Sequence, residues 1–136
     1  MIKLDRQRTK RIFEKLLLVA PELKQIEEHA KSTVPGLMDL NLDVLVQQHD
    51  YMRIALSHYW QHSSGDMIAD PDMEIGVYWD MRLAEALTYQ DMFIYEVAYQ
   101  RDGGAPDLAI HTRINIFLEH WLENLAAQGH VLRRSI

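Results

Sequence analysis

The sequence contains no cysteine, which excludes disulfide bonds, zinc sites built on thiolates and a thiol nucleophile. It also lacks internal repeats, low-complexity segments and any sign of a second domain. Of its 136 residues, 48% are apolar and 25% are charged, an ordinary balance for a globular protein. These features predict a single domain over residues 1–136, large enough to bury a core without metal ions or disulfides.

Long apolar runs are missing as well. The longest, at residues 16–20, falls far short of the ~20 residues that a membrane-spanning helix needs. The first eleven residues are charged and show no apolar stretch before a cleavage site, so no signal peptide is predicted. We therefore expect a cytoplasmic protein with no membrane span.

Sequence motifs for common cofactors are absent. There is no GxGxxG, GxxxxGK[ST] or GxSxG pattern, which excludes standard dinucleotide, P-loop and hydrolase sites at the motif level. The seven histidines show no HExxH spacing, and the acidic run at residues 66–74 lacks the glycine and glutamate of an EF-hand loop. We expect no metal and no cofactor, and we interpret His58 as a hydrogen-bonded core residue.

Positive charge is scarce in the middle of the chain. Residues 37–96 hold eleven acidic residues but only two basic ones, Arg53 and Arg82. This balance makes nucleic acid an unlikely partner. The first fifteen residues hold six basic side chains against two acidic ones. We expect them to lie against the protein's own acidic body, with an anionic partner as the alternative.

Helical spacing of apolar residues marks both ends of the chain. Residues 12–20 predict a first helix, which Pro21 ends and from which a short second helix follows. After the break at residues 103–106, an apolar stripe predicts a long last helix, with Gly129 just beyond its end. The stripe consists of Ile110, Ile114, Phe117, Leu118, Trp121, Leu122 and Leu125.

A period of two predicts strands between these helices. Residues 40–47 and 52–60 form a predicted hairpin that turns at His49-Asp50, and residues 73–79 form a third strand after a loop at 61–72. We prefer a fourth strand to a helix at 81–90, and leave 92–99 as a fifth strand or a short helix. The predicted fold is α+β: an antiparallel sheet of four to five strands flanked by N-terminal and C-terminal helices in two layers. Phe117, Trp121 and Leu122 should dock onto a sheet face made of Ile54, Leu56, Ile75 and Val77.

Several short pieces resemble the YqiB-like bacterial family of unknown function (DUF twelve-forty-nine). They are residues 70–75 (DPDMEI), 78–85 (YWDMRLAE), 89–90 (YQ), 115–118 (NIFL) and 121–122 (WL), with Gly129 at the end. The likeness covers residues 10–130. It implies a shared fold and a cytoplasmic location, but it implies no activity and no catalytic residues. Trp79 stands where the family usually has a histidine.

The polar face of the predicted sheet is the candidate site. Arginine suits carboxylate or phosphate, and tyrosine offers a flat ring with a hydroxyl. We expect Arg53, Tyr59, Tyr78, Asp80, Arg82 and Glu85 to bind a small anion there, although cross-strand ion pairs explain the same residues. The predicted function is a non-catalytic binding or regulatory module that acts on a small anion or a protein partner. A small enzyme and an assembly module, such as a homodimer, are the alternatives.

Overall fold

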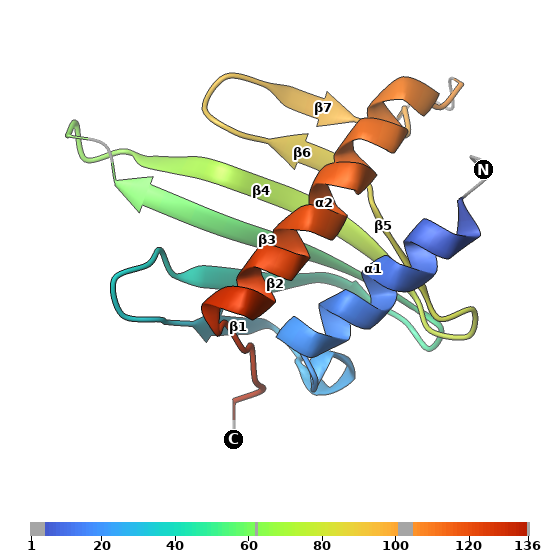
Figure 1. Ribbon diagram of the computed structural model, residues 1–136, viewed down its shortest axis with the longest axis horizontal. Helices are drawn as coiled ribbons and strands as arrows, with labels where there is room; N and C mark the ends of the chain where they lie inside the picture. Colours follow the sequence, from blue (N-terminus) through green and yellow to red (C-terminus); the bar gives the residue numbers. More distant parts are fainter. Residues whose placement is uncertain (1–4, 62, 101–104, 136) are drawn as a thin grey trace.

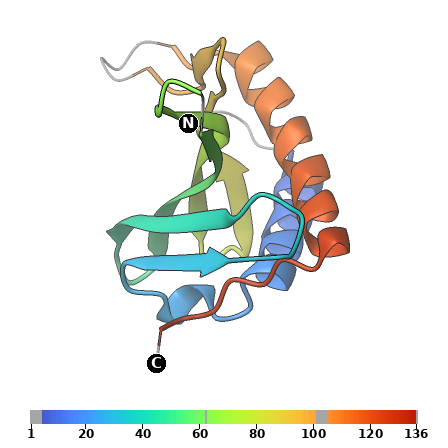
Figure 2. The same ribbon diagram turned by 90° about the vertical axis from the view of Figure 1, so that its left-hand side faces the viewer.

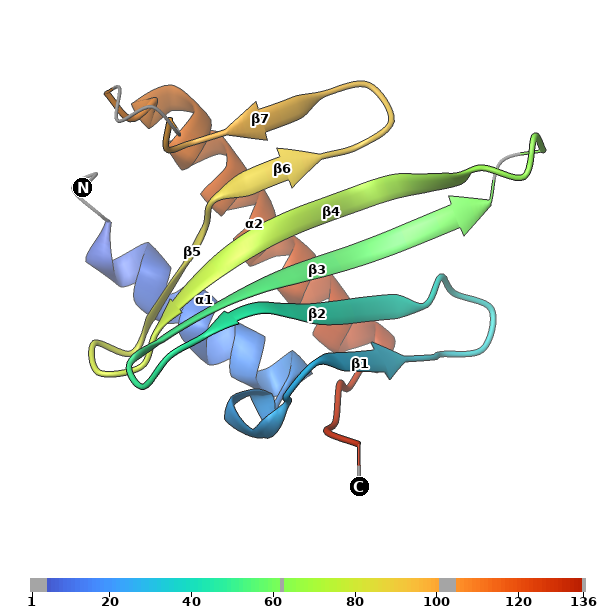
Figure 3. The same cartoon turned by 180° about the vertical axis from the view of Figure 1, so that it is seen from behind.

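The computed structural model describes residues 5–61, 63–100 and 105–135, and it has two layers. One layer is an antiparallel sheet, and the other consists of two helices that cover the same face of that sheet (Figure 1, Figure 2). In the described part of the chain, the opposite face carries no helix (Figure 3). The helices are α1, Arg6–Val19, and α2, Leu108–Gln128. Neither is long and apolar enough to cross a membrane, and the same holds for every described helix.

The described residues form a sheet of seven strands, more than the four to five predicted. The strand order is β1-β2-β3-β4-β6-β7, and β5 pairs separately with β4. Because β5 and β6 pair with successive parts of β4, one long strand supports both. The strands are β1 His29–Ser32, β2 Leu40–Gln47, β3 Tyr51–Gln61, β4 Met67–Tyr78, β5 Leu83–Ala86, β6 Thr88–Gln90 and β7 Tyr95–Val97.

Capping residues mark where both helices begin and where α2 ends. At the start of α1, the Asp5 carboxylate accepts hydrogen bonds from the backbone N–H groups of Gln7 and Arg8. At the start of α2, the Asp107 carboxylate accepts one from the backbone N–H of Ile110. Gly129 ends α2 at φ 92°, a left-handed conformation that glycine adopts without steric cost, as predicted.

The core lies between the sheet and the helices. Ile54 and Leu56 of β3 and Ile75 and Val77 of β4 are fully buried, as are Leu118 and Leu122 of α2. The period-two and helical patterns therefore identified the two faces that meet. Phe117 is the exception, because 38% of it is exposed at the side of the helix.

One predicted segment is shorter than expected, and another is wrong. Pro21 ends α1, but only one turn of 3₁₀ helix follows at Leu23–Gln25, and the next residues form the edge strand β1. The predicted loop at 61–72 is largely strand, because β4 begins at Met67. The register of β3 and β4 shifts between Ser57 and Tyr59, which allows Pro71 to lie within a strand although it has no N–H to donate.

Other predicted segments are confirmed. The hairpin turns at His49-Asp50, with the Gln48 N–H donating to the Tyr51 carbonyl. Residues 81–90 contain no helix but two strands, β5 and β6, where one strand was predicted, and residues 92–99 contain the short strand β7. Of the break at 103–106, Gly103 and Gly104 lie outside the described residues.

Candidate functional site

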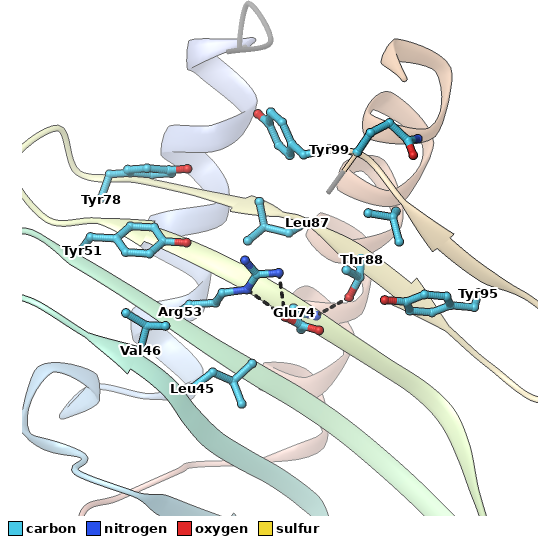
Figure 4. Close-up of a pocket in the computed structure, with 12 residues that line it drawn as sticks. Leu45, Val46, Tyr51, Arg53, Glu74, Tyr78, Leu87, Thr88, Tyr95 and Tyr99 are labelled. Atoms are coloured by element: carbon cyan, nitrogen blue, oxygen red, sulfur yellow. Dashed lines mark hydrogen bonds and ion pairs between the residues drawn. The ribbon is translucent and has the colours of Figure 1, made fainter. Parts of the chain in front are cut away.

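A pocket of about 650 Å³ opens on the sheet face that the helices leave uncovered (Figure 4). Its volume lies within the ~300–1,000 Å³ usual for small-molecule sites. Four tyrosines, four aliphatic residues and a few polar groups line it. They are Leu45 and Val46 of β2, Tyr51 and Arg53 of β3, Glu74 and Tyr78 of β4, Leu87 and Thr88, Tyr95 and Val97 of β7, and Tyr99 and Gln100.

An ion pair crosses the floor of this pocket (Figure 4). The Glu74 Oε1 atom lies 2.8 Å from Arg53 Nε and 2.7 Å from Arg53 Nη2. The backbone N–H of Glu74 donates to the Thr88 hydroxyl oxygen at 3.0 Å. Arg53 thus reaches the pocket with its charge already balanced by a neighbouring strand.

Behind the pocket wall lies a buried carboxylate, Glu85, of which 1% is exposed. Its Oε2 accepts a hydrogen bond from the Tyr78 hydroxyl at 2.7 Å. Its Oε1 accepts one from the Tyr99 hydroxyl at 2.7 Å and lies 2.8 Å from His111 Nε2 in α2. Both carboxylate oxygens are therefore engaged, and two of the three donors are pocket tyrosines.

The environment moves the pKa values of these groups away from neutrality. Burial alone would raise the pKa of Glu85, but hydrogen bonds from His111, Tyr99 and Tyr78 outweigh it and leave the pKa below its ordinary value. Burial, together with the hydrogen bond to Glu85, raises the pKa of Tyr78. Burial also raises the pKa of Tyr51. Near pH 7, Glu85 is ionised, and Tyr51 and Tyr78 keep their protons.

Gly76 lies beneath the two tyrosines of β3 and β4 that line the pocket. A Cβ at Gly76 would lie 3.4 Å from the hydroxyl oxygens of both Tyr51 and Tyr78. The two tyrosine rings lie 5.3 Å apart between centroids, tilted by 47°. A Cβ at position 76 would therefore touch both hydroxyls at ordinary van der Waals distance.

The predicted site residues divide into two groups. Arg53 and Tyr78 line the pocket, and Glu85 holds Tyr78 from behind. Tyr59 lies farther along β3, where its hydroxyl donates to Asp72 at 2.5 Å and burial raises its pKa to about 12. Asp80 is exposed in the turn between β4 and β5.

The structure places Arg82 apart from Arg53, contrary to the sequence-based expectation. Arg82 has φ 54° in the turn that follows β4, and its guanidinium lies 5.1 Å from the centroid of the Phe13 ring in α1. It therefore stacks on the helix layer, and the two arginines do not form a joint anion site.

Sequence reasoning missed most of the pocket. Tyr51 precedes Arg53 by two residues, so the period of two could have found it. Tyr95, Val97 and Tyr99 also alternate, but the residues around them suit either a strand or a short helix. No pattern in the sequence marks His111 as part of the site, because it reaches Glu85 only through the packing of α2 against β5.

No metal centre is seen in the parts of the chain that the structure describes. None of their His, Asp and Glu side chains gather in groups of three or more that could hold a metal ion. The predictions of no metal and no cofactor are not tested by this finding.

Comparison with known proteins gives a family but no activity. A family model described as Domain of unknown function (DUF6908) matches residues 7–131. No curated protein and no solved structure matches the chain. The resemblance to the YqiB-like family is not tested by this match. Because the matched span covers most of the chain and every residue of the pocket, the chain belongs to the DUF6908 family of domains of unknown function.

Proposed function

We propose that this protein is a non-catalytic binding module that holds a small ligand in the pocket on its open sheet face. The observation that carries the proposal is a pocket of ligand size, lined by tyrosine and aliphatic side chains, whose polar groups are already held in place. Tyr78 and Tyr99 are fixed by Glu85, and Arg53 is fixed by Glu74. Side chains oriented before the ligand arrives lose little freedom when it binds.

The state of the buried carboxylate supports binding over catalysis. A general acid or base works best when its pKa lies near the operating pH. The pKa of Glu85 is lowered and that of Tyr78 is raised, so both move away from pH 7. Glu85 also has no oxygen without a partner, which suits a group that positions its neighbours.

A small enzyme is the second candidate, and the same cluster favours it. Glu85 is a buried carboxylate that contacts a histidine and two hydroxyls at a pocket wall. Buried and convergent ionisable groups of this kind mark many active sites. The two functions differ in one observable, which is whether the bound compound is recovered unchanged.

A thermal-shift screen of metabolites, followed by two pocket variants, tests the proposal. A ligand at ~100 times its dissociation constant stabilises the folded state by about 2.7 kcal/mol. Tyr51→Ala and Tyr95→Ala remove ring surface from the pocket and should weaken binding at least tenfold. Tyr89→Phe is the matched control, because Tyr89 also donates to a carboxylate, Asp91, but does not line the pocket.

Mass spectrometry of the released compound completes the test. An unchanged compound supports a binding module, and a chemically altered one supports the enzyme. Stabilisation that survives both Tyr51→Ala and Tyr95→Ala would place the ligand elsewhere and reject the proposed site.

Four expectations from the sequence remain proposals. They are a cytoplasmic location, a homodimer, kinship with the YqiB-like family and recognition of a small anion. Of the two arginines on which the anion depended, only Arg53 lines the pocket, and Glu74 already pairs with it. A small anion would therefore have to compete with Glu74 for Arg53.

A further inference from the structure

We infer that the pocket selects a small organic amine, protonated at neutral pH, with an apolar body. The inference rests on the proposed binding function and names the chemical class of its ligand. It follows from the direction of the hydrogen bonds, the balance of charge and the arrangement of tyrosine rings.

The hydrogen bonds to Glu85 have a fixed direction. An ionised carboxylate can only accept hydrogen bonds, so the protons of the Tyr78 and Tyr99 hydroxyls point toward Glu85. Toward the pocket, the Tyr78 oxygen, whose only proton is donated to Glu85, offers only lone pairs. A ligand that donates N–H groups matches them. A ligand that only accepts would have to turn a hydroxyl away and leave the buried carboxylate short of a partner.

The charge of the pocket wall points the same way. Arg53 is neutralised by Glu74. That leaves the ionised Glu85, which His111 contacts from the side of α2. Whether or not His111 carries a proton, the summed charge of the four side chains is zero or negative. They are Arg53, Glu74, Glu85 and His111. Residues 37–96, which supply most of the pocket lining, hold eleven acidic residues against two basic ones. A cation is attracted to such a wall and an anion is repelled.

Tyrosine rings form much of the pocket lining and suit a cation. Tyr51, Tyr78, Tyr95 and Tyr99 all line the pocket, with Tyr51 and Tyr78 on one side and Tyr95 across from them (Figure 4). The faces of aromatic rings attract cations. Leu45, Val46, Leu87 and Val97 provide surface for the apolar part of the ligand.

Three probes that share an indole ring test the charge preference. They are tryptamine, which is a cation at pH 7, the neutral alcohol tryptophol, and the anion indole-3-propionate. We expect isothermal titration calorimetry to show that tryptamine binds at least tenfold more tightly than tryptophol and that the propionate binds most weakly. Added salt should weaken tryptamine binding more than tryptophol binding, because screening acts on the charge.

Two variants connect this preference to the buried carboxylate. Glu85→Gln removes the charge and adds a donor, so the preference for tryptamine over tryptophol should fall to threefold or less. Tyr78→Phe removes one fixed acceptor and should weaken tryptamine binding several-fold, which keeps the test decisive if Glu85→Gln does not fold. Tyr89→Phe should leave the affinities and their ratio unchanged.

The outcomes separate the inference from the proposed function. If tryptophol or the propionate binds as tightly as tryptamine, and binding depends on Tyr51 and Tyr95, the function stands and the amine preference is wrong. The preference is also wrong if Glu85→Gln keeps the full ratio, or if only compounds without an amine bind. If no compound binds in this pocket, both are wrong.

Discussion

Glu119 is the residue on which the basic face of α1 converges. Its Oε2 lies 2.7 Å from Arg11 Nε and 2.6 Å from Lys15 Nζ, and Arg8 approaches its other oxygen at 3.8 Å. The hydrogen bond from Arg11, followed by that from Lys15, lowers the pKa of Glu119 to about 2. The basic N-terminal segment does lie against acidic groups of the same protein, but these groups are on α2 rather than in the acidic middle of the chain.

We predict that Glu119→Gln lowers the free energy of unfolding at pH 7 by about 1–2 kcal/mol, since three cations lose their charged acceptor. The folded pKa of Glu119 lies below its ordinary value of 4.5. Its contribution is therefore complete above pH 4.5 and disappears as the pH falls toward 2. Urea unfolding of the wild type and of Glu119→Gln, from pH 7 down toward pH 2, should show that the difference in their free energies of unfolding shrinks.

Glu123→Gln is the control for this prediction. Glu123 contacts Lys15 at 2.6 Å, but 47% of its side chain is exposed, so its loss should cost less than about 1 kcal/mol. Equal effects of the two substitutions would show that the cluster around Glu119 adds nothing beyond ordinary surface pairs.

His130 couples stability to pH near neutrality. It is buried, its Nδ1 lies 2.9 Å from the Ser32 hydroxyl, and its Nε2 has no hydrogen-bond partner among the described residues. Burial, and then the nearby His58 ring at 5.7 Å, lower the pKa of His130 below its ordinary 6.5, while Asp39 acts in the opposite direction. The folded state therefore holds this histidine in its neutral form.

We predict that the protein loses stability as the pH falls below 6.5. The unfolded chain binds a proton there that folded His130 resists, so the loss approaches at most ~1.4 kcal/mol per pH unit until the folded pKa is reached. His130→Phe fills a similar volume without titrating. Chemical denaturation at pH 7.5 and 5.5 should show a smaller pH effect in this variant, and an equal effect would assign the titration to other groups.

The best-predicted elements are those whose own spacing of apolar residues shows which face packs in the core. The central strands β3 and β4 alternate buried and exposed residues, and α2 carries a continuous apolar stripe. Edge strand β1 has four residues and too short a pattern to identify. In β4, Pro71 is a residue typical of loops. The register shift that accommodates it in a strand depends on the partner strand β3, so it cannot be inferred from the local sequence.

The pocket could be predicted only in part, because pairing between distant elements builds it. Arg53, Glu74 and Tyr78 follow from alternation on the central strands. The place of Glu85 depends on the pairing of β5 with β4 opposite Gly76. Tyr99 and His111 come to this carboxylate from other elements. Nothing in the local sequence separates Glu85 from a surface glutamate.

Docking of α2 onto the sheet should dominate the stability of the fold. Trp121 is only 7% exposed, and its ring lies 5.6 Å from that of His58 in β3. We predict that Trp121→Ala costs about 3–5 kcal/mol, because it leaves a large cavity. Phe117→Ala, at a position that is 38% exposed, should cost clearly less. A cost below about 1 kcal/mol for Trp121→Ala, measured by urea unfolding, would contradict this packing.

In the whole molecule, the helix layer and the pocket lie on opposite faces of one sheet. The helix layer joins the two ends of the chain, since α1 and α2 pack together and are linked by ion pairs. The segment after α2 continues this link. The Leu132 N–H donates to the Val19 carbonyl at 2.7 Å, and the Val131 N–H donates to the Ser32 hydroxyl at 3.0 Å. The open face takes no part in these contacts, which leaves it free for a ligand.

We predict that deleting residues 131–136 lowers the free energy of unfolding by about 2–4 kcal/mol, because Leu132 is fully buried and two hydrogen bonds to α1 and β1 are lost. Deleting only residues 134–136 should change it by less than about 0.5 kcal/mol, since Arg134 is exposed. Because the pocket lies on the other face, the longer deletion should leave ligand affinity within about twofold at a temperature where it stays folded. Equal stabilities of the two truncated proteins would show that the segment after Gly129 does not hold the helix layer together, and a large loss of affinity would show that the two faces are coupled.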